Sequence, residues 1–173
     1  SGRVDVLPLS LVTAPTEALI NAEEAKLHLR IDEDQYAEES WLDNAIDAAT
    51  NYCQEEIMGS RQFVSATYDL GVNAWWCGQL RIPRPPLSSV TWIKYYDANG
   101  TQQTLSSSIY TTRTATRQKG SVELAFNQTW PTTDGRDFPI TIRFVCGYGA
   151  ASAVPKAIKQ AVLLTLGWMY DQG

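Results

Sequence analysis

The stretch Tyr36–Gly59, YAEESWLDNAIDAATNYCQEEIMG, is the most strongly patterned part of the sequence and decides its fold. Apolar residues recur there at intervals of three and four, which is the spacing of an amphipathic helix packed on a core. These residues are Leu42, Ala45, Ile46, Ala49, Tyr52, Cys53 and Ile57. Gly59 is a natural C-terminal stop, so we predict a helix over 36–58 with Asp43 and Asp47 on its polar face.

Two further helices are predicted, one before this stretch and one near the end of the chain. Asn21 followed by Glu24 has the spacing of a capping box, which begins a short helix over 22–31. Pro155 suits the first turn of a final helix over 155–170. This last helix is apolar on both sides, so both sides must be buried, by its own domain or by a neighbouring subunit.

Between the helices, from about residue 61 to residue 146, the pattern changes to that of strands. Alternation or β-forming residues predict strands near 64–70, 80–82, 89–96, 109–113, 121–126 and 139–146. Asp97–Gly100 is typical of a hairpin turn. The predicted fold class is therefore α+β, a helical bundle of two N-terminal helices plus a C-terminal helix with an inserted antiparallel β-sheet. Residues 1–20 are expected to form an extended arm before a single domain over 21–173.

Charge and cysteine content restrict the possible functions. The net charge of -5 leaves no basic surplus for tight binding to nucleic acid. Cys53, Cys77 and Cys146 are widely spaced and the one histidine is His28, so we expect reduced thiols in a cytosolic product, without a disulfide framework or a metal site. No apolar run reaches the ~18 residues of a membrane span, so no membrane partner is expected.

No group of residues adds up to an active site, so we predict no enzymatic activity, no catalytic residue and no cofactor. His28 would need a nucleophile or an orienting carboxylate to act as a base, and the sequence indicates neither. The adjacent glutamate pairs, such as Glu23 with Glu24, diverge by about 100° on a helix and do not converge on one cleft.

Three groups of residues are candidates for contact with partner proteins. Trp75 and Trp76 lie in a predicted loop, where large aromatic side chains often anchor a partner. Basic residues surround a predicted hairpin tip that ends at Gly120, and they are suited to an acidic neighbour or to phosphates; these are Arg113, Arg117 and Lys119. The third group lies on the final helix and consists of Leu163, Leu166, Trp168 and Tyr170.

Five segments, taken together and in order, resemble the phage head–tail connector family in its gp6-like and phiE125 gp8-like forms. The segments are EAKLHLRID (24–32), IPRPPLSSV (82–90), YYDANG (95–100), VCGYG (145–149) and VPKAIKQA (154–161). The resemblance covers nearly the whole chain. The residues before Pro15 and the aromatic loop 75–78 depart from the family's pattern.

The resemblance implies a structural adaptor without catalytic residues. Members of that family form a ring of identical subunits, usually dodecameric, that docks beneath the portal protein and receives a tail or stopper protein on its other face. DNA passes through the lumen without tight or specific binding. The implied location is the neck of the virion, after synthesis in the cytoplasm of the host bacterium. A closed ring needs two different complementary faces, and the helix over 36–58 and the final helix are our candidates for them.

Three other interpretations remain open from the sequence. A tail-completion or stopper protein would have a similar composition, although such proteins are dominated by a small β-barrel. A protein-binding module would use the Trp75–Trp76 loop, and replacing both residues with alanine would abolish its binding. An enzyme of unknown chemistry would be indicated if His28→Ala removed a defined turnover without loss of the fold.

Overall fold

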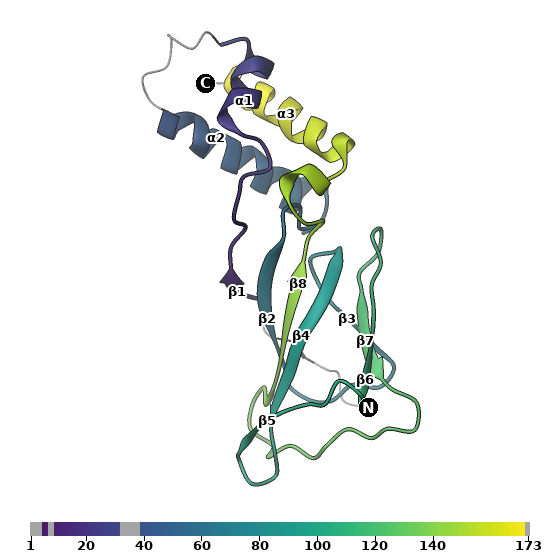
Figure 1. Cartoon of the computed structure of the whole chain (residues 1–173). Helices are drawn as coiled ribbons and strands as arrows, with labels where there is room; N and C mark the ends of the chain where they lie inside the picture. The colour runs from purple at the N-terminus through teal and green to yellow at the C-terminus, as the bar shows by residue number, and fades with distance from the viewer. Residues whose placement is uncertain (1–4, 7–8, 32–38, 172–173) are drawn as a thin grey trace. The chain divides into compact units, whose positions relative to one another are not determined.

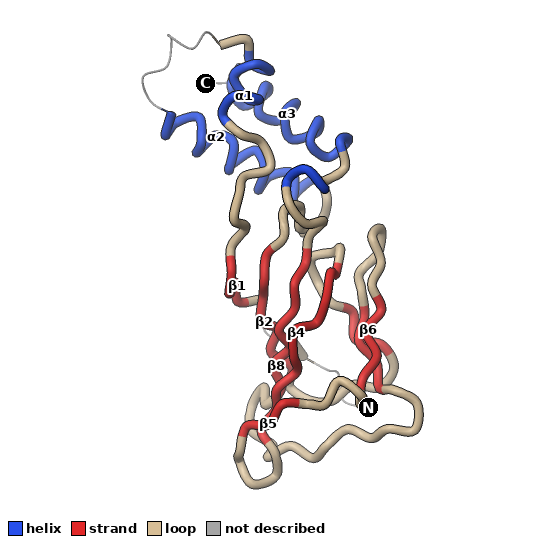
Figure 2. Tube along the Cα trace, in the orientation of Figure 1, coloured by secondary structure: helices blue, strands red, loops and turns tan. Residues whose placement is uncertain are grey.

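The structure is a computed structural model that describes residues 5–6, 9–31 and 39–171. The chain divides into two compact units, each with its own cluster of buried side chains (Figure 1). A β unit comprises residues 1–14 and 66–147, and a helical unit comprises residues 15–65 and 148–173. Figure 2 colours the helices blue and the strands red. Over the described ranges the fold is α+β, as predicted, with three α-helices and two antiparallel sheets.

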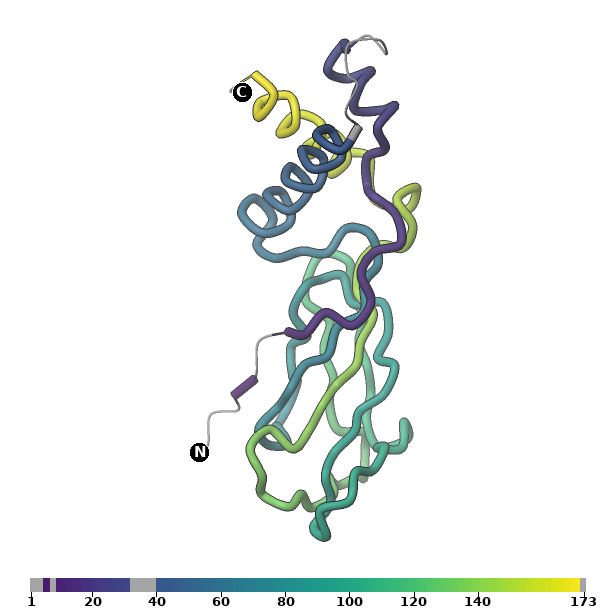
Figure 3. The backbone as a smooth tube through the Cα atoms, turned by 90° about the vertical axis from the view of Figure 1, so that its left-hand side faces the viewer, coloured from purple at the N-terminus to yellow at the C-terminus, as the bar shows by residue number. Residues whose placement is uncertain are grey.

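The helical unit consists of α1 (Ala22–Leu29), α2 (Glu39–Tyr52) and α3 (Lys156–Asp171), and the three helices stay together in both views (Figures 1 and 3). A π-helical turn, Cys53–Ile57, continues α2. Most of the predicted apolar stripe of α2 and the turn joins the core with residues of α3, but the predicted Tyr52 and Ile57 are exposed instead. The buried side chains of these two helices and the turn are Leu42, Ile46, Ala49, Cys53, Ile158, Val162 and Leu166.

The helix boundaries differ from the prediction at a few positions. The cap of α1 is as expected, because the side chain of Asn21 accepts a hydrogen bond of 2.8 Å from the backbone N–H of Glu24. The helix predicted over 22–31 ends at Leu29, because Arg30 adopts a left-handed conformation with φ 56°. The helix predicted over 155–170 spans Lys156–Asp171. The predicted start of the helix over 36–58 lies outside the described residues.

The first sheet of the β unit is antiparallel throughout, with strand order β1-β2-β8-β4-β5. The strands are β1 (Ser10–Thr13), β2 (Ala66–Val72), β4 (Leu87–Tyr96), β5 (Gln102–Thr104) and β8 (Ile140–Cys146). In the central strand β8 every second side chain is fully buried, namely those of Ile140, Ile142, Phe144 and Cys146. This alternation directs one face of the sheet towards the core of the β unit.

The prediction of one inserted sheet is wrong, because three strands form a second antiparallel sheet with the order β3-β7-β6. These strands are β3 (Gln79–Arg81), β6 (Tyr110–Arg113) and β7 (Ser121–Leu124). The alternation in a sequence shows which face of a strand is buried but not which strand it pairs with. Pro83–Pro86 separates β3 from β4, because proline cannot continue a ladder of hydrogen bonds.

Part of the predicted N-terminal arm belongs to the first sheet. Ser10 and Leu11 of β1 pair with Asp69 and Tyr68 of β2. All four residues of β1 are exposed, so the strand has no buried face that a pattern of apolar residues could reveal. The expectation of an extended backbone is correct for this segment, but its pairing with β2 was not predicted.

A polar ladder crosses the other face of the first sheet. Asp69 on β2 lies opposite Arg143 on β8, and the carboxylate accepts hydrogen bonds of 2.8 Å and 2.9 Å from the guanidinium. Trp92 on β4 lies beside Arg143, with the guanidinium carbon 4.6 Å from the ring centroid. The two contacts hold the three central strands together on the face away from the core.

Gly120 is expected to be sensitive to the addition of a single methyl group. A Cβ at this position would lie 2.5 Å from Cβ of Leu87 and 2.9 Å from the carbonyl oxygen of Arg113. We expect Gly120→Ala to lower the free energy of unfolding by about 1–3 kcal/mol, the usual cost of overpacking. Gly167→Ala is the matched control, because its Cβ would lie 3.4 Å from the side chain of His28 on a helix that favours alanine. Urea denaturation of both variants checks this, and equal midpoints would contradict it.

Candidate assembly surfaces

The helix α3 keeps an apolar stripe exposed on the side away from the core. Leu164 and Trp168 are each 60% exposed. Ala157 and Ala161 continue the stripe at spacings of four, three and four residues, which is the spacing of a helix–helix seam. The sequence predicted that α3 is buried on both sides, and a single copy of the chain buries only one. The second side is therefore a candidate surface for assembly.

The four residues predicted as contacts on α3 have different environments. Trp168 is on the exposed stripe, while Leu163 is partly buried and packs against the core of the helical unit. Leu166 is only 1% exposed and belongs to that core, so it does not lie on the surface. Tyr170 meets Trp41 of α2 edge-on, with 6.0 Å between ring centroids. The sequence missed Leu164 in this set, although its spacing from Trp168 is that of one helical turn.

Trp75 and Trp76 lie in a loop, as predicted, but Trp76 belongs to the core of the β unit and Trp75 packs against that core, so neither is presented to a partner as an open anchor. Trp76 is 5% exposed, and Trp75 stacks on Trp130 with 4.6 Å between ring centroids. The indole N–H groups of Trp75 and Trp76 donate hydrogen bonds of 2.7 Å and 2.8 Å to the carbonyls of Pro131 and Val122. Their packing partner Trp130 is distant in sequence, so local pattern gave no sign of this cluster.

A different aromatic residue of the β unit is exposed to solvent. Phe126 follows β7 and is 91% exposed, the highest value among the large exposed apolar side chains. It lies in a tight turn in which the N–H of Gln128 donates to the carbonyl of Ala125 at 3.2 Å, and Asn127 adopts φ 59°. Phe126 is not among the predicted contact residues. The Asn-Gln-Thr sequence that follows it is the signal of a turn that could have found it.

The β6–β7 hairpin forms where it was predicted and carries the basic residues of the second candidate group. Arg113 pairs with Glu123 across the hairpin at 2.7 Å, and its side chain is 63% exposed. Arg117 and Lys119 lie exposed in the loop that joins the two strands. Together with Arg81 on β3, Arg113 and Lys119 line a cleft of about 440 Å³, which we call the basic cleft.

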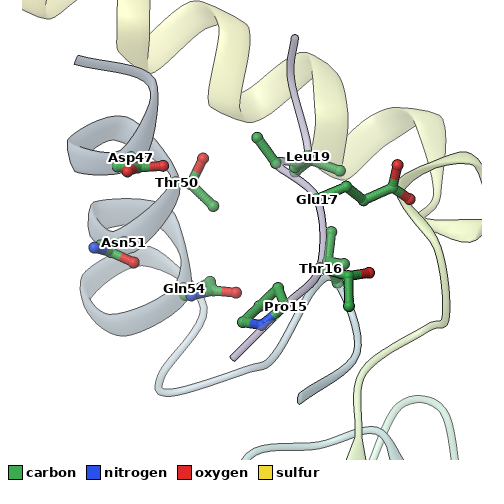
Figure 4. A pocket seen from close by; sticks show the side chains of 10 residues that line it. Pro15, Thr16, Glu17, Leu19, Asp47, Thr50, Asn51 and Gln54 are labelled. Atoms are coloured by element: carbon green, nitrogen blue, oxygen red, sulfur yellow. The ribbon is translucent and has the colours of Figure 1, made fainter. Parts of the chain in front are cut away.

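A groove in the helical unit has polar walls but not the arrangement of a catalytic site (Figure 4). It encloses about 420 Å³ between the segment Pro15–Leu19 and α2. The carbonyl oxygen of the Gln54 side chain accepts a hydrogen bond from the backbone of Phe63 at 3.0 Å. Glu17 points away from α2 in the figure and accepts a hydrogen bond from Ala151 at 2.7 Å. These hydrogen bonds tie the groove's walls to the segment before β2 and to the turn before α3, so they stabilise the helical unit.

His28 lies in a more apolar hollow between α1 and α3. Leu27 and Leu163 line this hollow, and Lys159 bridges it through an ion pair with Glu24 at 3.2 Å. The ring of His28 packs close to Gly167 of α3. No serine, threonine or cysteine lines the hollow, and two of its charged residues, Lys159 and Glu24, form an ion pair with each other.

Neither a metal site nor a membrane span is found over the residues that the structure describes. No group of three His, Cys, Asp or Glu side chains in these ranges is arranged to hold a metal ion. In the same ranges, no helix is both long enough and apolar enough to cross a membrane. The candidate surfaces on the described residues are the exposed apolar stripe of α3, the exposed Phe126 and the basic cleft of an α+β protein.

Solved structures of phage-like particles contain chains with the same fold. A chain in the neck of an empty gene transfer agent particle, computed with C6 symmetry, matches with TM-score 0.80 and 24% identity over 95% of this chain and 84% of that chain. The neck of the native particle, computed with C12 symmetry, contains a match with TM-score 0.74 and 23% identity over the same shares. No protein-family model and no curated protein matches the sequence. The fold expected from the family resemblance is thereby confirmed.

Replacing Trp76 is expected to unfold the β unit rather than remove a surface contact. Trp76→Ala deletes a buried indole and leaves the carbonyl of Val122 without its donor, so we expect a loss of about 3–5 kcal/mol in the free energy of unfolding. Trp168→Ala on the exposed stripe is the control and should change it by about 0.5 kcal/mol or less. Thermal denaturation followed by near-UV circular dichroism distinguishes them. Equal melting temperatures of the two variants would contradict the burial of Trp76.

The three thiols are expected to react at very different rates. Cys77 is exposed, whereas Cys53 and Cys146 are buried. Burial raises the pKa of the Cys146 thiol to about 12, so this group stays protonated and unreactive in the folded protein at pH 8. Ellman's reagent should therefore modify one thiol rapidly in the native chain and all three after denaturation. Cys77→Ser should abolish the rapid phase, and a second rapid thiol in that variant would contradict the buried positions.

Proposed function

We propose that the chain is a structural subunit of the neck of a tailed phage or phage-like particle, a head–tail adaptor that forms a ring beneath the portal. The observation that carries this proposal is the match over 95% of the chain, at TM-score 0.80, to a chain of a gene transfer agent neck. The five segments that resemble the phage head–tail connector family support it independently. A tail or stopper protein binds the other face of the ring.

The exposed stripe of α3 supports assembly into a closed ring. Identical subunits related by rotation contact each other through two different surfaces, one from each neighbour. Leu164 and Trp168 provide an apolar surface of the kind that becomes buried in such contacts. The related necks were computed with C6 and C12 symmetry, which is consistent with a ring of twelve copies.

The adaptor works by assembly and not by catalysis. No group of three His, Cys, Asp or Glu side chains among the described residues could hold a metal ion. A net charge of -5 suits the wall of a channel through which DNA passes without being held. Such a subunit is made in the cytoplasm of the host bacterium and resides in the neck of the virion.

A tail-completion or stopper protein is the second candidate. The observation against it is the size of the helical part, in which three helices and a π-helical turn enclose a core of their own. The third interpretation, a module that binds proteins through Trp75 and Trp76, loses its basis because Trp76 is buried.

The native mass of the purified chain over a range of concentrations, with negative-stain images of any large species, tests the proposal. We expect closed rings with an open centre, either with the chain alone or after mixing with tailless heads that carry their portal. A chain that forms no ring and does not bind such heads would contradict the adaptor function.

The double variant Leu164→Glu and Trp168→Glu should prevent ring formation while leaving the monomer folded. Both side chains are exposed in a single copy, so their replacement costs the monomer little, whereas charges in an apolar interface are strongly unfavourable. Phe126→Glu is the matched control, since Phe126 is an exposed apolar residue of the β unit. Rings formed by the double variant as readily as by the wild type would exclude α3 from the subunit contact.

A further inference from the structure

The two units of the chain carry opposite net charges. The helical unit contains 13 Asp and Glu against 5 Lys and Arg, a net charge of -8. The β unit contains 6 acidic against 9 basic residues, a net charge of +3, and the two values add to the -5 of the whole chain. The difference in net charge between the two units is therefore larger than the net charge of -5 on the whole chain. It gives one copy of the chain two surfaces of opposite sign.

The negative charge of the helical unit includes an exposed pair of carboxylates on α2, Asp43 and Asp47. The segment Glu39–Ile57 contains five acidic residues and no lysine or arginine. Asp43 and Asp47 are exposed and one helical turn apart, an arrangement that disfavours a helix by about 0.2–0.5 kcal/mol. The like-charge contact between Asp43 and Asp47 is therefore electrostatically unfavourable in an isolated copy.

The positive charge of the β unit is concentrated at the basic cleft. Arg81, Arg113 and Lys119 line it, and the exposed loop residue Arg117 lies two positions before Lys119. Glu123 is paired with Arg113 and is not one of the lining residues. The other lining side chains are neutral and include Gln79 and Gln118. The cleft thus offers several donors to a carboxylate from outside the molecule.

We propose that the basic cleft of one copy binds the acidic face of α2, at Asp43 and Asp47, in the next copy around the ring. The inference rests on the proposed ring and names a second contact in it, separate from the apolar stripe of α3. Charge complementarity selects a second copy as the occupant, because the same chain supplies both surfaces and a rotational ring brings different surfaces together.

Duplex DNA is the less suitable occupant of the basic cleft. Proteins that hold DNA neutralise many phosphates along a continuous basic surface, and log K then falls steeply with log salt. The basic cleft has three lining cations, one of which already pairs with Glu123. A carboxylate-bearing helix needs only two or three donors at such a cleft. The contact with α2 also relieves the like-charge repulsion between Asp43 and Asp47 in the neighbour.

A charge-swap experiment tests the contact. Lys119→Glu reverses one charge of the basic cleft, and Asp47→Lys reverses one charge of the α2 face. We expect each variant alone to raise the concentration for half-maximal ring formation by about tenfold or more at low salt. The double variant Lys119→Glu/Asp47→Lys, and an equimolar mixture of the two single variants, should regain assembly because the swapped charges again attract. Gln102→Glu/Thr104→Glu on the exposed strand β5 is the control, with the same change of net charge as Lys119→Glu.

The measurement is mass photometry of the chain, repeated on tailless heads if the wild type assembles only there. Single variants that assemble like the wild type would overturn this contact and leave the adaptor function intact. Loss of assembly in the single variants without rescue by the charge swap would also overturn it. Binding of a labelled 30-base-pair duplex by the wild type would also overturn it, if Lys119→Glu abolished that binding and the double variant with Asp47→Lys did not restore it. A wild-type chain that neither forms rings nor binds the heads would instead contradict the proposed function itself.

Discussion

The pairing of strand β8 with β2 on one side and β4 on the other is the constraint on which the β unit depends. Its four inward side chains are fully buried, and its outward Arg143 joins Asp69 and Trp92 across both neighbours. Strand β8 ends at Cys146. The backbone then turns at Gly147 and Gly149, whose φ angles are 107° and 121°. Few residues other than glycine adopt such angles without strain, so the strand ends at a defined position.

The helical unit follows a different principle. Its core is made by helices that pack along stripes, and α3 contributes only one of its two apolar sides. An exposed apolar stripe and an exposed pair of like charges one helical turn apart are both unfavourable in a single copy. Features of this kind are retained when another molecule covers them. The physical cost that these surfaces impose on the monomer supports the proposal that the chain works as part of an assembly.

The candidate site could be predicted only in part. The hairpin that carries Arg113, Arg117 and Lys119 was predicted, because its turn and flanking strands are local features. The burial of Trp76 was not predicted, because it depends on Trp130 and Val122, which lie far away in the sequence. Leu166 was likewise assigned to a surface that it does not occupy, since helical spacing gives two apolar sides of α3 but not which of them meets α2.

The sequence by itself determined the elements: the three helices, most of the strands, the hairpin turn at Asp97–Gly100 and the cap at Asn21. Each of these arises from contacts between residues within about one or two turns, which a local pattern records. The tertiary structure alone decided that the strands form two sheets, that β1 joins the first, and that opposite charges gather on separate units. Those outcomes depend on pairing and packing between distant segments, and the free energy of such contacts is not encoded in any one stretch of the chain.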